Sequence, residues 1–242
     1  PQFFHFTRFT KGFFDIEPKE SFIKRNQGIN YNKRCTAASK MRSNDSATLW
    51  FTDLVTAYEK NDIPALKDEP YVNNINNYRY TIVYEMDSKS FPNEPVVKYS
   101  TTWEEVAKTI FDHLYFGDQL KKSKHLVNEA AQIKASKGDD TGKIRAAFDH
   151  IKQQMTWDGN VGKYTSGPIE KAYKNGSGNV AEINLSLIAL LRATGLQAYP
   201  VLLSTRAHGV PLFPTLEGYN YVIAGVQTDN GVVLLDATEK LS

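Results

Sequence analysis

The longest apolar stretch of the chain lies near its C-terminal end and predicts a buried helix. Between residues 180 and 195, Val, Ile and Leu side chains occur on nearly all sides of a helical wheel, which is typical of a helix enclosed by other elements. Asn179 is a favourable N-cap, and Glu182 three residues later completes a capping-box pattern. Gly195 supplies the left-handed residue at which helices often end. The pattern therefore predicts a central helix of about four turns.

Shorter patterns predict the elements around this helix. Three apolar runs after it predict strands at residues 197–203, 219–226 and 231–236. Alternating apolar and polar positions near the N-terminus predict half-covered antiparallel strands at residues 3–9, 48–58 and 78–86. Helical spacing predicts further helices at residues 102–114, 120–135, 141–155 and 168–173. Polar, glycine-bearing or proline-bearing stretches predict breaks at residues 34–45, 63–71, 88–100 and 159–167.

The order of these elements predicts an α+β fold in two parts. An antiparallel β-rich segment occupies residues 1–98 and is followed at residues 99–242 by helices and by the buried helix with its sheet. We expect the N-terminal segment to be the second half of a preceding domain together with a linker. The start at Pro1 and the ending directly after a core strand lead us to expect that the natural chain continues on both sides.

Three short motifs resemble the transglutaminase-like superfamily, whose members have a papain-like fold. They are Gly-Asn-Val at 178–180, Leu-Leu-Arg-Ala-Thr-Gly at 190–195 and Leu-Asp-Ala-Thr at 235–238. In that superfamily, a Gly-x-Cys sequence opens a buried helix, a His lies in the second following strand and an Asp ends the third. The segment at 63–70 also resembles the linker of a bacterial subgroup in which a β-rich domain of unknown function precedes the transglutaminase-like domain.

This sequence departs from the superfamily pattern at two of the three catalytic positions. The resemblance places Val180 at the nucleophile position, Tyr221 at the base position and Asp236 at the acid position. Acyl transfer of this kind needs a thiolate and an imidazole that a carboxylate orients. Valine has no lone pair, and tyrosine, with a pKa of about 10, is a poor base near neutrality. We therefore predict a catalytically inactive relative that acts in binding or scaffolding.

Two other functions remain open at this stage. The first is an active acyl transferase or amide hydrolase with a rebuilt site that uses Asp236, Tyr221, His208 or Ser177. The second is a purely structural spacer in a larger exported protein. The resemblance also indicates which residues surround the old active-site cleft, and these are the candidates for binding a peptide or a glycan. They are Trp157, Lys163, Tyr164, Asn179, Arg206, His208, Asn220, Tyr221 and Asp236. Because a carboxylate near a buried site must find a partner, Asp236 is expected to accept from the Tyr221 hydroxyl or a backbone N–H, or else from a ligand.

Composition excludes some classes of function and leaves others open. The 242 residues have a formal net charge of +2, so no strong basic field favours nucleic acid. No apolar run approaches the roughly 20 residues of a membrane span, and no signal peptide is visible. The resemblance alone implies a bacterial protein exported to the periplasm or cell envelope. The sequence does not determine the oligomeric state.

The remaining reactive residues suggest no second chemistry. Cys35 is the single cysteine and lies in a polar, basic stretch without a helix start, so we interpret it as an incidental thiol. The five histidines match no zinc spacing, and we expect neither a metal nor a cofactor. His208 is expected to be a solvated loop residue. The run Gly176–Asn179 lacks the Gly-Lys-Ser/Thr ending of a nucleotide loop, so we assign it a turn and capping role.

Overall fold

A computed structural model of the chain describes residues 4–12, 16–24, 29–32, 46–49, 52–67, 69–91, 95–99 and 102–238. The chain forms two compact units, one of residues 1–12 with 68–242 and the other of residues 13–67. The predicted domain boundary near residue 98 stays a prediction. Cys35 and the predicted loop at 34–45 lie outside the described residues.

The unit of residues 13–67 contains two antiparallel strand pairs. β2 (Lys19–Lys24) pairs with β5 (Thr52–Ala57), and β3 (Ile29–Asn32) pairs with β4 (Ser46–Leu49). The strand predicted at 48–58 is thus divided between β4 and β5. Residues 61–67 contain no helix or strand, as their proline content predicts.

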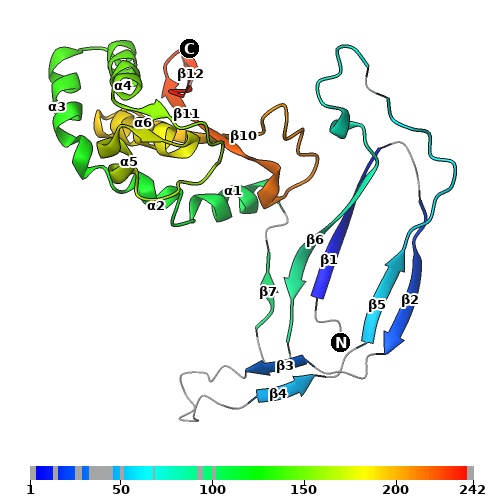
Figure 1. The fold of residues 1–242 in the computed structure, drawn as a ribbon. Coiled ribbons are helices and arrows are strands. Elements are labelled where there is room, and N and C mark those ends of the chain that lie inside the picture. Colours follow the sequence, from blue (N-terminus) through cyan, green and yellow to red (C-terminus); the bar gives the residue numbers. More distant parts are fainter. Residues whose placement is uncertain are drawn as a thin grey trace. The chain divides into compact units, whose positions relative to one another are not determined.

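The other unit begins with an antiparallel sheet in the order β1–β6–β7 (Figure 1). Its strands are β1 (Phe4–Lys11), β6 (Thr81–Lys89) and β7 (Val97–Lys98). Two predicted bounds here are wrong. Asn74 caps the short 3-10 helix η1 (Ile75–Asn77), which holds residue 78 out of β6, and pairing with β7 extends β6 into the predicted break at 88–100.

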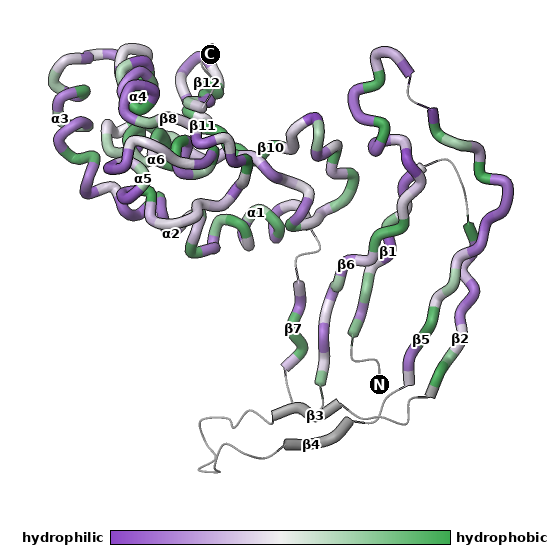
Figure 2. Tube along the Cα trace, in the orientation of Figure 1, coloured by the Kyte–Doolittle hydropathy of each residue, from purple (hydrophilic) through white to green (hydrophobic). Residues whose placement is uncertain are grey.

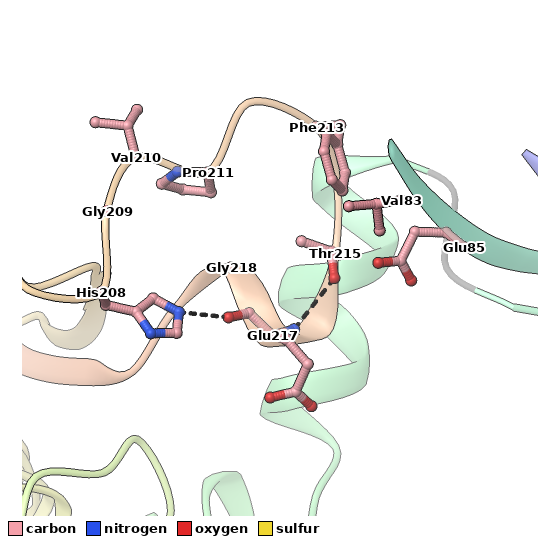
Figure 3. Close-up of a pocket in the computed structure, with 10 residues that line it drawn as sticks. All are labelled: Val83, Glu85, His208, Gly209, Val210, Pro211, Phe213, Thr215, Glu217 and Gly218. Carbon is pink, nitrogen blue, oxygen red and sulfur yellow. Dashed lines mark hydrogen bonds between the residues drawn. The ribbon is translucent and has the colours of Figure 1, made fainter. Parts of the chain in front are cut away.

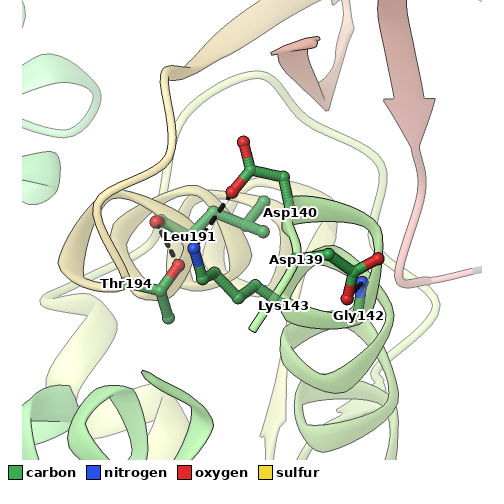
Figure 4. A network of polar contacts seen from close by, with 6 residues as sticks. All are labelled: Asp139, Asp140, Gly142, Lys143, Leu191 and Thr194. Carbon is green, nitrogen blue, oxygen red and sulfur yellow. Dashed lines mark hydrogen bonds and ion pairs between the residues drawn. The ribbon is translucent and has the colours of Figure 1, made fainter. Parts of the chain in front are cut away.

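Helices fill the middle of this unit. They are α1 (Trp103–Phe111), α2 (Gly117–Leu120), η2 (Lys124–Leu126), α3 (Val127–Ser136), α4 (Asp140–Gln154) and α5 (Ile169–Asn175). The capping box predicted for the first helix is present, with Thr102 as N-cap and Glu105 at the third position. Asp139 is the N-cap of α4, and its side chain accepts a hydrogen bond from the N–H of Gly142 (Figure 4).

The single helix predicted at 120–135 is wrong. The chain forms α2, η2 and α3 instead, with a break at residues 121–123. Leu120 and Leu126 are both buried, although six residues of continuous helix would rotate them about 120° apart. The break allows both side chains to face the same core.

The central helix α6 (Val180–Ala193) is confirmed, and its first twelve residues are all buried. Asn179 and Glu182 form the predicted capping box, and Gly195 has a φ of +94°. At the other end the Thr194 hydroxyl donates to the Leu191 carbonyl at 2.7 Å (Figure 4). α6 packs against α3, α4 and α5 and against the sheet beside it, and it is largely green in the hydropathy colouring (Figure 2).

The sheet beside α6 has three antiparallel strands in the order β10–β11–β12, as the sequence predicts. They are β10 (Ala198–Leu203), β11 (Tyr221–Thr228) and β12 (Gly231–Leu235), with η3 (Leu216–Gly218) before β11. A short parallel pair of β8 (Thr156–Trp157) and β9 (Ser177–Gly178), which the sequence does not reveal, leads into α6. The α+β fold class is confirmed. Within the described residues, none of the helices has the length and apolar character of a membrane span.

Candidate functional site

Tyr221 and Asp236 meet where β11 begins and β12 ends. The Tyr221 hydroxyl donates to Asp236 Oδ2 at 2.8 Å. The backbone N–H and the hydroxyl of Thr238 donate to Asp236 Oδ1 at 3.1 and 2.7 Å. The two hydroxyl oxygens of Tyr221 and Thr238 lie 2.7 Å apart. The partner expected for Asp236, the Tyr221 hydroxyl or a backbone N–H, is therefore confirmed.

Asn184 connects this pair to the central helix. Its Nδ2 donates to Asp236 Oδ1 at 2.9 Å and to the Val222 carbonyl at 3.0 Å, and its Oδ1 accepts from the Ala237 N–H at 2.9 Å. Asn184 is fully buried, so its contacts with the Val222 carbonyl and the Ala237 N–H are shielded from water, whereas its partner Asp236 is half-buried. Four side chains, those of Asn184, Tyr221, Asp236 and Thr238, thus form one hydrogen-bonded group, which we call the Asp236 network.

Val180 is the first residue of α6 and lies one turn before Asn184, on the same face of the helix. Its side chain is 0% exposed and belongs to the hydrophobic core. Its backbone N–H donates to the Asn160 carbonyl at 3.3 Å. The position that the resemblance assigns to a nucleophile therefore carries a buried aliphatic side chain.

The N-terminus of α6 is occupied by the protein's own groups. The Glu182 carboxylate accepts from the N–H groups of Asn179 at 2.9 Å and Ser166 at 3.1 Å, and Glu182 is itself 7% exposed. The Asn179 side chain accepts from the Glu182 N–H and donates to the Tyr164 carbonyl. This buried carboxylate already lies against the positive end of the helix dipole, which supports the capping role assigned to the Gly176–Asn179 run.

The loop at 158–167 covers the same helix end. Trp157 Nε1 and the Val180 N–H share the Asn160 carbonyl as acceptor. The Tyr164 ring packs on His113 with a centroid distance of 4.3 Å, and burial raises the pKa of its hydroxyl. The loop thus brings Trp157, Tyr164 and Asn179 together, mainly through hydrogen bonds to backbone carbonyls.

Lys163 connects this loop to η3 and to the residues that lead into β11. Its ammonium group donates to the carbonyls of Leu216 at 2.8 Å and Tyr219 at 2.9 Å, and the residue is 7% exposed. Burial lowers the pKa of this ammonium, while the charge of Glu217 opposes the shift. Backbone carbonyls, and not a carboxylate at ion-pair distance, therefore hold this cation.

The other predicted residues lie on the connection between β10 and β11. The Asn220 side chain accepts from the Thr205 N–H and donates to the Thr205 hydroxyl, each at 2.9 Å. The ring of His208 is exposed, as predicted, and its Nε2 lies 2.7 Å from the Glu217 carbonyl. Arg206 contributes its backbone carbonyl, which accepts from Asn74 at 2.9 Å. Among the described residues, Arg206, His208 and Asn220 form no hydrogen bond with Asp236. The side chains of His208 and Asn220 and the backbone of Arg206 instead stabilise the connection between β10 and β11.

His125 and His150 both contact Tyr173. His150 Nε2 lies 2.7 Å from the Tyr173 hydroxyl, and the His125 ring contacts the same tyrosine ring edge-on at 5.2 Å. Burial lowers the pKa of His125. Among the described residues, no group of three His, Cys, Asp or Glu side chains is arranged to hold a metal ion.

Sequence reasoning missed Asn184, and it quoted Thr238 only as part of a motif. A signal for Asn184 was available, because an amide within an otherwise apolar buried helix must have hydrogen-bonding partners inside the protein. Its spacing of four residues from Val180 places it on the face that looks toward the ends of the following strands.

Comparison with known proteins agrees with this geometry. Residues 128–237 match the family described as the transglutaminase-like superfamily. The crystal structure of a candidate protease from Parabacteroides distasonis superposes on 98% of this chain with a TM-score of 0.53 and 13% identity, which indicates a shared fold. The chain spans 44% of the length of that protein.

Two other solved structures superpose more loosely, each with a TM-score of 0.38. They are the periplasmic domain of TgpA from Pseudomonas aeruginosa, which is 13% identical, and a candidate cysteine protease from Cytophaga hutchinsonii, which is 12% identical. The superpositions cover 66% of this chain and 55% of the TgpA domain, and 98% of this chain and 73% of the Cytophaga protein. No curated protein matches the sequence. Over residues 128–237 the chain is thus similar to the transglutaminase-like superfamily.

Proposed function

We propose that this transglutaminase-like domain does not catalyse acyl transfer and acts instead in binding or scaffolding, with a peptide or a cell-envelope glycan as ligand. The observation that carries the proposal is the fully buried Val180 at the first position of α6. A cysteine at a helix N-terminus is activated by the helix dipole and by a neighbouring imidazole. An isopropyl group in the same place has nothing to activate.

The role of Tyr221 supports the same proposal. A general base must accept a proton, but the Tyr221 hydroxyl donates its proton to Asp236. Asp236 in turn accepts from Asn184 and Thr238 as well. A carboxylate with these partners stabilises the junction of α6, β11 and β12 without any imidazole to orient.

An active enzyme with a rebuilt site has less support. Ser177 is exposed on β9 and, within the described part of the chain, forms no hydrogen bond with a histidine. His208 is engaged with the Glu217 carbonyl. A rebuilt acyl transferase needs a hydroxyl nucleophile and a base within hydrogen-bonding reach of each other. We include export to the cell envelope in the proposal because the motifs resemble those of exported proteins.

The direct test is turnover. Purified protein is incubated with a glutamine-containing peptide and a primary amine, and release of ammonia is followed. We expect no release above the buffer background, and no difference between wild type and Asp236→Ala. Turnover that Asp236→Ala abolishes would overturn the proposal and favour the rebuilt enzyme.

Labelling with a cysteine-directed acyl probe gives an independent measurement. The wild-type protein is expected to react at Cys35 alone, and Cys35→Ser is expected to leave no labelled protein. A label on another residue of Cys35→Ser would reveal a covalent nucleophile and contradict the proposal. Binding of a peptide or glycan by this same protein would distinguish a binding module from a purely structural spacer.

A further inference from the structure

Two groups of titratable side chains lie outside the Asp236 network. One belongs to an open cavity of about 240 Å³ between β6 and the connection from β10 to β11 (Figure 3). Its carboxylates, those of Glu85 and Glu217, do not converge on the cavity, and Glu217 acts instead on the charge of Lys163 (Figure 3). The cavity therefore has no shared binding point. The other group surrounds His125, where side chains of η2, α3, α4 and α5 come together.

Tyr173 of α5 is at the centre of this second group and is itself 8% exposed. Its ring contacts the His125 ring edge-on, with centroids 5.2 Å apart. Its hydroxyl lies 2.7 Å from Nε2 of His150 on α4. The charge of Glu129 on α3 acts on both Tyr173 and His125. We call His125, Glu129, His150 and Tyr173 the His125 cluster.

Two atoms of this cluster are buried without a hydrogen bond. Within the described part of the chain, His125 Nε2 and Glu129 Oε2 are the buried side-chain atoms that lack a partner. A neutral imidazole tolerates this arrangement when its unpaired nitrogen carries no proton, because no donor is then left unsatisfied. Protonation adds an N–H and a positive charge at His125 Nε2, and both then lie in the protein interior without an acceptor.

The charges around His125 do not compensate for its burial. Burial is the largest influence and lowers the pKa of His125, while the carboxylates of Glu170 and Glu129 partly oppose it and Lys174 reinforces it. Glu170 already pairs with Lys174 at 2.6 Å. Among the described residues, no ion pair joins His125 to Glu129. A cation at this position is therefore poorly stabilised.

The central helix, which also packs on η2, supplies no free charge to this corner. α6 carries two charged residues, Glu182 and Arg192. The Glu182 carboxylate accepts from backbone N–H groups at the start of the helix. Arg192 Nε donates to the Ala198 carbonyl at the other end. The response to protonation of His125 must therefore come from η2 and α3.

These two elements are weakly held where they begin. η2 follows Ser123 and α3 follows Leu126, and neither of these N-cap residues forms a side-chain capping bond. Val127 is 56% exposed, so Leu126, which is fully buried, is the main apolar anchor. An imidazolium at His125 also lies beside the positive end of the α3 dipole, which disfavours it further. Opening of this corner alone exposes His125 to water at a lower cost than global unfolding.

We propose that the His125 cluster is a pH-sensitive latch, in which protonation of His125 in mild acid opens η2 and the first turn of α3 while α6 and its sheet stay folded. The open form binds the proton more tightly, because His125 regains its ordinary pKa of 6.5 there. The closed form is therefore fully favoured above that value and loses stability as pH falls toward the lower pKa of the closed form. The latch involves no ligand and no acyl transfer, so it does not depend on the function proposed above.

Amide hydrogen exchange of the intact protein, followed by NMR between pH 7 and pH 5, tests the latch. After correction for the intrinsic effect of pH on exchange, the protection factors of residues 124–130 should fall by about tenfold. Those of residues 183–190 in α6 should change by less than about twofold. An equal fall in α6, or constant protection at 124–130, would overturn the proposal.

Variants identify the group that titrates. His125→Phe keeps an aromatic ring against Tyr173 but binds no proton, so it should remove the pH dependence of protection at 124–130. His5→Phe, which replaces a half-buried histidine of β1, should retain it. If the pH dependence of His125→Phe equals that of the wild type, His125 is not the latch.

A charge variant provides a measurement that does not require His125→Phe to fold. Glu129→Gln removes a carboxylate that favours the protonated ring, so the loss of protection should shift to lower pH than in the wild type. The NMR titration of the His125 ring should shift in the same direction. A purely structural role of Glu129 would leave both midpoints in place, and that result would contradict the proposal.

Discussion

Two polar sites in the same unit of the chain differ in how their carboxylates are satisfied. Asp236 accepts from Tyr221, Asn184 and Thr238, and all of its acceptor oxygens have partners. Glu85 and Glu217 line a cavity and have no such partners among the described residues. The motifs singled out in the sequence include Asp236 of the first site, whereas none of them includes a residue of the second.

The difference separates a carboxylate that protein groups satisfy from carboxylates that lack such groups. Protein groups that already satisfy a carboxylate must be displaced before a ligand can use it, and that displacement costs free energy. A carboxylate without such partners carries no such cost. The comparison therefore indicates that the Asp236 network stabilises the junction of α6 with β11 and β12.

Replacement of Asn184 should give the largest effect. Asn184→Leu fills the same buried space but removes the Asn184 donor to the Val222 carbonyl and the Asn184 acceptor of the Ala237 N–H. It also removes one of the donors to Asp236 Oδ1. Unsatisfied buried groups each cost about 1–3 kcal/mol, so we expect the free energy of unfolding to fall by about 3 kcal/mol. Urea denaturation measures this change.

The matched control is Asn128→Leu on the exposed surface of α3. Its free energy of unfolding should stay within about 0.5 kcal/mol of wild type. If Asn184→Leu were equally mild, the Asp236 network would not stabilise the junction of α6 with β11 and β12. The structural role inferred for Asp236 would then be wrong.

The sequence predicts this first site far better than the second, for a physical reason. Helix capping and apolar periodicity are local, so Asn179, Glu182 and the span of α6 could be read directly. The meeting of Tyr221 with Asp236 follows from the antiparallel order of strands that the resemblance supplies. The contacts of Asn184 and Lys163 depend on tertiary packing. Their only indication is that a buried polar side chain must find hydrogen-bonding partners inside the protein.

The cavity could not be predicted because its walls come from distant parts of the chain. Val83 lies more than 100 positions before Phe213 in the sequence. The break in the helix predicted at 120–135 has a similar origin, since tertiary burial of Leu120 and Leu126 outweighs local helical spacing. Local patterns specify elements well, but they do not specify which side chains of separate elements meet.

Replacement of Lys163 should give a smaller effect that depends on pH. Lys163→Met removes the donor to the Leu216 and Tyr219 carbonyls but also relieves the burial of a charge. These effects oppose each other, so we expect a loss of about 1 kcal/mol at pH 7. Urea denaturation at several pH values measures it.

The pH dependence has a definite sign. Because burial lowers the pKa of Lys163 in the folded protein, the unfolded chain binds the proton more tightly. The wild type therefore gains stability from this group as pH rises from the folded pKa toward the ordinary value of 10.5. Lys163→Met lacks this gain, so its deficit should grow over that window, whereas the exposed control Lys171→Met should show no such growth. A constant deficit would contradict the burial of the ammonium.

The smallest stability effect is expected at the cavity, where it tests the comparison most directly. Glu85→Gln and Glu217→Gln should change the free energy of unfolding by no more than about 0.5 kcal/mol, because among the described residues neither carboxylate has a hydrogen bond or an ion pair to lose. Asp236→Asn is the matched variant at the other site. It weakens hydrogen bonds to a charged acceptor and should cost about 1–2 kcal/mol in the same urea titration. If Glu85→Gln cost as much as Asp236→Asn, the Glu85 carboxylate would have a structural partner, and the contrast between the two sites would disappear.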